Sequence, residues 1–200
     1  MVATWTPTAN LIGGSDGTPL EREDENGTFG RLYASIEVFD FAAERVVPST
    51  LRIDGPMRRA FTATCDTSRI VVASGLGPAT LNGPEGSKYD WVQSFTPGNP
   101  QPWSYLPMLS MNLFSPGIFD VAGTLVVVGG SRYDRRPNPD VLILKPGANN
   151  WVVNSSRPSK AGTFLELVPL ANREVLVLGG HSGSRADPNP LGLCEVLTIN

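Results

Sequence analysis

The sequence predicts an all-β protein built from repeated units of short strands, and three observations support this expectation. Four apolar runs each end in small residues, at positions 10–14, 69–75, 124–130 and 174–180. Three of them end in Gly-Gly and the second in Ser-Gly, and the closing glycines lie 61, 55 and 50 residues apart. Further short apolar segments lie between the runs. Finally, 21 glycines and 18 prolines in 200 residues exceed the usual share of about 12%, which disfavours long helices.

Each unit offers three or four strands. A second apolar segment follows each run, at 36–41, 90–97, 140–146 and 194–200, and another precedes three of the runs, at 59–65, 114–121 and 163–170. Short strands at intervals of about ten residues are typical of all-β proteins. A period near 50 with four strands per unit predicts a β-propeller. The run at 125–128 suits an inner strand that is buried on both faces.

The repeat has a signature of glycines and tryptophans. Paired glycines let the backbone turn with positive φ and approach a neighbour closely, and a tryptophan fills the space between units. The signature residues are Gly13, Gly14, Gly75, Gly129, Gly130, Gly179, Gly180, Trp103 and Trp151.

This pattern resembles the kelch repeat of the galactose-oxidase-like β-propellers. The third unit matches best, and its matching residues are Val127, Val128, Gly129, Gly130, Asp140, Val141, Pro146, Asn149 and Trp151. It departs from the family at Leu144, where a tyrosine is usual. The resemblance implies one kelch-type propeller domain over residues 1–200, with units of approximately 1–55, 56–108, 109–158 and 159–200. Such folds host many activities, so function must be sought in the loops.

The number of blades is left open. The resemblance implies six or seven blades, which need about 300 residues at this period, and the chain has material for about four. It is therefore part of a larger propeller, a small ring of about four blades, or an open array that another subunit completes. In the small ring, residues 2–6 would pair beside residues 194–200 and Trp5 would supply the missing tryptophan. The first unit is expected to lack its inner strand, because only eight positions separate Trp5 from Gly13.

Composition excludes several classes of partner. The formal net charge of −3 and the pI of about 5.2 argue against nucleic acid. No apolar run approaches the ~20 residues of a membrane span, and no leader is visible, so we expect an intracellular, cytoplasmic protein without a membrane partner. Cys65 and Cys194 are expected to be buried, reduced thiols.

No catalytic residue, metal or cofactor is predicted. The fold family that this pattern resembles includes copper oxidases that hold their metal with two histidines and two tyrosines, but His181 is the sole histidine of this chain. One imidazole cannot fill two ligand positions. Ser182 and Asp187 lie too close to His181 along one loop for triad geometry.

The favoured function is a non-enzymatic scaffold that binds protein partners through its loops, since a rigid framework often carries binding residues on loops. Thirteen arginines against three lysines suit an interface. The candidate residues are Arg132, Arg135, Arg136, His181, Arg185, Asp187 and Glu23. Two alternatives stay open: a carbohydrate-active or sugar-isomerase-type kelch enzyme with its site on the same face, and a structural subunit of a larger assembly. Unpaired blade edges would also allow the chain to associate with itself.

Overall fold

The fold is all-β, as the sequence predicts. The computed structural model describes residues 2–5, 8–15, 32–47, 49–54, 62–65, 69–75, 90–97, 99, 101–113, 115–132, 136–182 and 189–200. Their strands form four antiparallel sheets. Within these ranges no helix is long and apolar enough to cross a membrane.

Each sheet is built from consecutive strands. The first sheet contains β1 (Val2–Trp5), β2 (Thr8–Ser15), β3 (Leu32–Asp40) and β4 (Arg45–Val47). The second contains β5 (Thr62–Cys65), β6 (Ile70–Ala73), β7 (Val92–Phe95) and β8 (Trp103–Leu106). The third contains β9 (Gly117–Val121), β10 (Thr124–Val128), β11 (Val141–Leu144) and β12 (Val152–Val153). The fourth contains β13 (Glu166–Pro169), β14 (Glu174–Leu178) and β15 (Cys194–Thr198).

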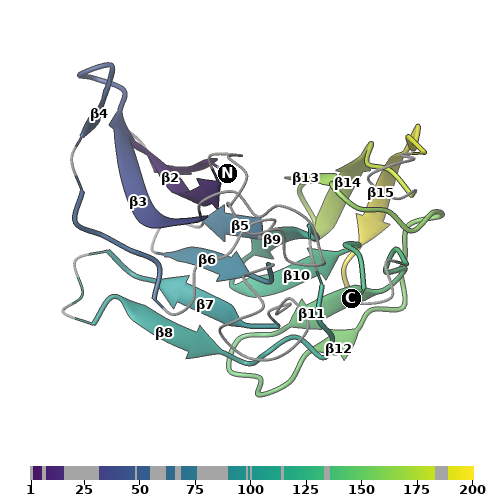
Figure 1. Ribbon diagram of the computed structural model, residues 1–200. Helices are drawn as coiled ribbons and strands as arrows, with labels where there is room; N and C mark the ends of the chain where they lie inside the picture. Colours follow the sequence, from purple (N-terminus) through teal and green to yellow (C-terminus); the bar gives the residue numbers. More distant parts are fainter. Residues whose placement is uncertain are drawn as a thin grey trace, which may run out of the picture.

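The four sheets follow one another along an open arc (Figure 1). Their first strands lie on its inner side, where β1 contacts β5, β5 contacts β9 and β9 contacts β13. The run at 125–128 is buried on both faces, as expected, but it forms the second strand of its sheet. The innermost position belongs to β9, which the preceding apolar segment supplies.

The two ends of the arc do not pair as the small ring would require. Among the described residues, β1 pairs with β2 and β15 with β14, in separate sheets. The expectation that the first unit lacks its inner strand is wrong, because β1 is that strand, in a register that runs from Val2 opposite Leu11 to Trp5 opposite Thr8. The short spacing from Trp5 to Gly13 is compatible with this strand, because two antiparallel strands can be joined by a connection of only two residues.

Three apolar cores join the sheets. The core between the first and second sheets contains Ile36, Ile53, Ile70, Val72 and Phe95. The core between the second and third sheets includes Val71, Ala73, Val92, Leu109, Leu113, Ile118, Leu125, Val127, Leu142, Leu144 and Trp151. The core between the third and fourth sheets contains Phe119, Val126, Val128, Val141, Ile143, Leu165, Val175, Val177, Leu191, Leu193, Leu197 and Ile199. Alternate residues of one strand thus enter different cores, as the pleat requires.

The glycine pairs close the second strands in a left-handed conformation. Gly129 and Gly179 have φ values of 68° and 61°, and Ser74 takes the same conformation at 69°. Ser74 replaces the missing glycine and donates a hydrogen bond from its hydroxyl to the Leu113 carbonyl. In the first sheet the pair Gly13–Gly14 lies inside β2, where the register shifts between Ile12 and Gly14. Such an irregularity is where a strand tolerates glycine best.

The two signature tryptophans join neighbouring units. Trp103 Nε1 donates to the Arg52 carbonyl at 2.8 Å, and Trp151 Nε1 donates to the Pro107 carbonyl at 2.7 Å. Each acceptor belongs to the segment that follows or closes the preceding sheet. Both tryptophans therefore combine an apolar contact with a satisfied polar group.

The expectation for the second cysteine is wrong. Cys194 is exposed at the start of β15, because the face of the fourth sheet that carries it has no neighbour among the described residues. The exposure of the Cys65 side chain lies outside what the structure describes.

Candidate interaction surface

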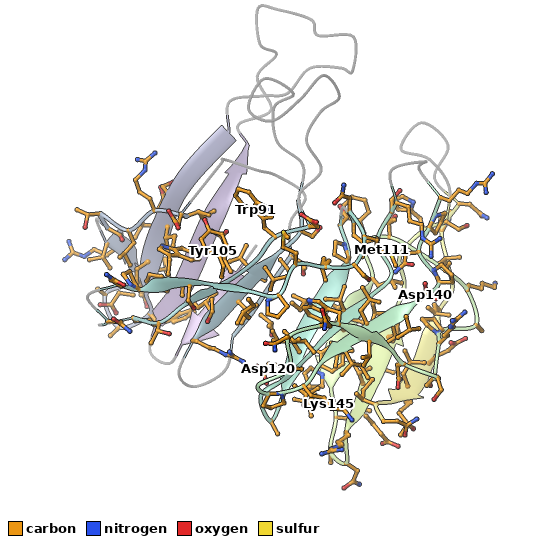
Figure 2. All side chains as sticks on the ribbon, turned by 90° about the horizontal axis from the view of Figure 1, so that it is seen from below. Trp91, Tyr105, Met111, Asp120, Asp140 and Lys145 are labelled. Atoms are coloured by element: carbon orange, nitrogen blue, oxygen red, sulfur yellow. The ribbon has the colours of Figure 1, made fainter. Side chains whose placement is uncertain are left out.

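The sheets have two ends, and one of them carries the candidate residues Arg132, Arg136 and His181. We call it the glycine end, because β6, β10 and β14 finish there in Ser74–Gly75, Gly129–Gly130 and Gly179–Gly180. Figure 2 shows Asp140 toward this end of the third sheet and Asp120 and Lys145 toward the other. At that opposite end Asp120 pairs with Arg69 of the second sheet at 3.1 Å.

Arg132 holds its own loop at the glycine end. Its guanidinium donates to Asn138 Oδ1 at 3.0 Å and to Asp140 Oδ2 at 3.1 Å. Asn138 is buried and donates to the carbonyls of Gly129 and Asp140 at 3.3 and 3.1 Å. Arg157 contacts the other carboxylate oxygen of Asp140 at 3.1 Å. This network ties Arg132, just after β10, to Asn138 and Asp140, just before β11, so Arg132 acts first as a positioning residue.

Arg136 is exposed on the same loop. The Arg132 amide donates to its carbonyl at 2.9 Å, and Ser131 forms an isolated bridge with Pro137. Residues 131–132 and 136–137 therefore lie side by side, and Arg136 is exposed beside them. The other candidates on the loops, Arg135, Arg185, Asp187 and Glu23, lie outside the described residues.

His181 belongs to a second feature of the glycine end, which we call the Phe164–His181 surface (Thr163, Phe164 and His181). The amides and carbonyls of Thr163 and His181 exchange hydrogen bonds of 2.9 and 3.1 Å. The His181 ring stacks on the Phe164 ring, with centroids 5.2 Å apart and planes inclined by 27°. The Thr163 hydroxyl lies 3.4 Å from Nε2 of the imidazole. A half-buried histidine is thus held against an aromatic ring by backbone pairing.

Phe164 is the residue that the sequence did not single out. Its side chain is 61% exposed and its backbone has a φ of 54°. A bulky residue with positive φ is uncommon and persists only where its surroundings fix it. Here the Phe164 amide donates to the Ser115 carbonyl at 3.2 Å, and Ser115 itself has a φ of 50°. Both residues lie two positions before the first strand of a sheet, but the sequence around them carries no sign of positive φ.

One carboxylate of the described residues has a clearly altered pKa. Hydrogen bonds from the hydroxyl and the amide of Ser159 lower the pKa of Glu195 below its usual 4.5. The Ser159 amide donates to Glu195 Oε2 at 2.8 Å and ties the segment after β12 to β15. This pair joins the third and fourth sheets. Among the described residues, no group of three His, Cys, Asp or Glu could hold a metal ion.

The comparisons with known proteins bear on the fold. No family model matches the chain, and no curated protein matches it. A solved structure described as "Structure of YjhT" superposes with a TM-score of 0.67 at 13% sequence identity. The likeness is one of fold. It covers 90% of this chain and 57% of that one, so the chain spans little more than half the length of that protein.

Proposed function

We propose that the chain is a protein-interaction module, built as part of a kelch-type β-propeller, that binds its partners at the glycine end. The propeller type is supported by the arc of similar sheets, the left-handed glycine pairs and the tryptophans that bond to the preceding unit. The interaction role is supported chiefly by one observation, the exposed and conformationally fixed Phe164.

Phe164 suits a binding anchor for a physical reason. An exposed aromatic ring offers a large apolar area, and its backbone is already fixed by one hydrogen bond to the Ser115 carbonyl and by the Thr163–His181 pairing beside it. Little conformational freedom is therefore lost on binding. Aromatic residues and arginine are the side chains most enriched at interaction hot spots.

The expected partner chemistry follows from the neighbouring charges. Arg136 is exposed at the same end of the molecule, and Arg132 and Arg157 retain exposed side-chain area of 40% and 50% beside Asp140. Guanidinium groups favour carboxylates. A peptide segment with one apolar or aromatic anchor and nearby acidic residues fits this surface best.

A carbohydrate ligand is the second candidate. An exposed aromatic ring beside a histidine offers an apolar platform with a polar edge, and such sites combine an apolar lining with a few placed polar groups. A carbohydrate ligand would agree with the carbohydrate-active alternative, and its binding would require no metal or cofactor.

One pair of screens separates the two candidates. The chain is presented to a displayed peptide library and to a glycan array, together with Phe164→Ala and Tyr105→Ala. Tyr105 is also an aromatic residue with a comparable exposed fraction, 56%, but it lies on β8, the outer strand of the second sheet, so it is a matched control. We expect acidic peptides with an apolar anchor to be enriched by the wild type and Tyr105→Ala and lost with Phe164→Ala. Glycan binding without peptide enrichment would contradict the peptide proposal, and peptides indifferent to Phe164 would contradict the site.

A further inference from the structure

The fourth sheet has an apolar face that nothing in the described chain covers. Val168, Leu176 and Val196 lie directly opposite one another on β13, β14 and β15. Val168 and Val196 are 40% and 52% exposed, and Leu176 is half-buried. We call these three residues the fourth-sheet row.

The same row in the third sheet is fully covered. Phe119, Val126 and Ile143 lie opposite one another on β9, β10 and β11. Val126 and Leu176 both lie three positions before the glycine pair of their strand, so the two rows are equivalent. The third-sheet residues are at most 2% exposed because they pack in the core shared with the fourth sheet. The fourth-sheet row therefore has the position of a sheet-packing face without its partner.

The surroundings of Gly129 and Gly179 show the same difference between the third and fourth sheets. A Cβ placed on Gly129 would lie 2.5 Å from the Gly162 carbonyl oxygen and 2.7 Å from Leu165 Cδ1, both contributed by the segment leading into the fourth sheet. A Cβ placed on the equivalent Gly179 would meet no described atom within 4 Å. Cys194 is exposed, whereas Val141 at the equivalent register is fully buried. The fourth sheet thus has the left-handed glycine that allows a neighbouring sheet to approach closely, but no described residue lies against that glycine.

The opposite end of the arc presents the complementary kind of face. Ile36 of β3 packs toward the second sheet, so Glu37 and Phe39, which alternate with it, face away from that sheet. Val46 lies opposite Phe39 and is 47% exposed, and Phe41 packs edge-on against Phe39 with ring centroids 5.2 Å apart. We call Phe39, Phe41 and Val46 the first-sheet patch.

A charged residue beside this patch is compatible with packing. Glu37 lies opposite Leu11, two positions before the glycine pair, and Gln93 and Glu195 hold the same register in the second and fourth sheets. Both of these lie on covered faces and bond the segment that leaves the preceding sheet, Gln93 to the Asp54 carbonyl at 2.7 Å and Glu195 to the Ser159 amide at 2.8 Å. The outer face of the first sheet is therefore built like the faces that meet a preceding sheet.

We infer that the fourth-sheet row of one copy of the chain packs on the first-sheet patch of a second copy. Every internal junction joins these two kinds of face, and the described residues leave one example of each uncovered. A second copy is thus a partner that offers the matching face, and two copies arranged head to tail satisfy both ends at once. This inference uses surfaces other than the glycine end and does not depend on the proposed peptide binding.

The first test is the oligomeric state of the 200-residue chain by sedimentation velocity over a range of concentrations. We expect a reversible dimer. Val196→Arg should weaken it by roughly tenfold or more, because a long charged side chain would replace an apolar one inside the contact and would lose its hydration there. Val152→Arg is the matched control, since Val152 is also a strand valine with 52% exposure but lies on the outer strand of the third sheet. A chain that remains monomeric throughout, or a dimer weakened equally by both variants, overturns the inference.

A second set of variants tests the orientation. Val46→Arg should also weaken the dimer, and an equimolar mixture of Val46→Arg and Val196→Arg copies should regain one junction, between the intact fourth sheet of the former and the intact first sheet of the latter. If Val46→Arg leaves the dimer unchanged, the fourth sheets pack on each other and the head-to-tail arrangement is wrong. Circular dichroism confirms that each variant is folded.

Cys194 supplies a readout that needs no substitution. The rate of alkylation of Cys194 is followed by peptide mass spectrometry at several protein concentrations. It should be high in dilute samples. In concentrated samples it should fall by about the fraction of chains that are in the dimer. Alkylation at the same rate across the dimerisation range would show that the fourth-sheet face stays open and would overturn the inference.

Discussion

At the scale of single residues, Gly129 and Gly179 have nearly the same backbone conformation in different surroundings. Both have positive φ, but only Gly129 lies against the next sheet. A side chain added at either position should therefore carry the same cost for the left-handed backbone. Only a side chain added at Gly129 should also collide with neighbouring atoms.

Replacing each glycine with alanine separates the two costs. Gly179→Ala should lower the free energy of unfolding by about 1–2 kcal/mol, the cost of a left-handed alanine. Gly129→Ala should lower it by about 1–3 kcal/mol more, because the added methyl group collides with a carbonyl and a leucine. Urea unfolding at a concentration where the chain is monomeric measures both. Equal losses would contradict the close packing at Gly129.

Glu195 makes the contact between the third and fourth sheets depend on pH. Its folded-state pKa lies below the usual 4.5, so the carboxylate stabilises the fold above pH 4.5, and this contribution is lost as the pH falls through the lower folded-state value. The stability difference between the wild type and Glu195→Gln should therefore be largest near neutral pH and shrink in acid. Ser159→Ala should reduce the same pH-dependent difference. Thermal melts between pH 7 and pH 3 measure it, and a difference that stays constant with pH would contradict the assignment.

At the scale of strands, β10 and β14 show what a local sequence does and does not determine. Both are short apolar runs closed by Gly-Gly, and both form the second strand of a sheet. The sequence predicted these strands because the β-branched runs and the glycines act locally. It predicted the double burial of β10 from the continuous apolar run, but it did not predict that the described residues leave one face of β14 uncovered, since that depends on whether another sheet lies alongside.

The difference in burial between these two strands predicts different losses of the free energy of unfolding on substitution. Ile143 and Val196 hold equivalent positions on β11 and β15. Ile143→Ala should cost about 2–5 kcal/mol, the usual range for a buried aliphatic residue. Val196→Ala should cost no more than about 0.5 kcal/mol in the monomer, as for other exposed positions. Denaturant unfolding distinguishes them, and similar losses would show that the fourth-sheet row is covered within one chain.

At the scale of the whole molecule, the repeat predicted an all-β chain, whereas the open arc and the surface at its glycine end required the structure. The charged loops drew attention to Arg132, yet its guanidinium is committed to Asn138 and Asp140, partners that only folding brings within reach. Phe164 escaped notice because it lies in an apolar segment that predicts a strand, and its exposure follows from the backbone turn just before β13.

The central claim is that a partner peptide binds the glycine end through Phe164, and isothermal titration calorimetry of an enriched peptide tests it most directly. Phe164→Ala should raise the dissociation constant by roughly tenfold or more, as for an aromatic hot spot, while Tyr105→Ala leaves it within about twofold. The same affinity for Phe164→Ala and the wild type would contradict the claim.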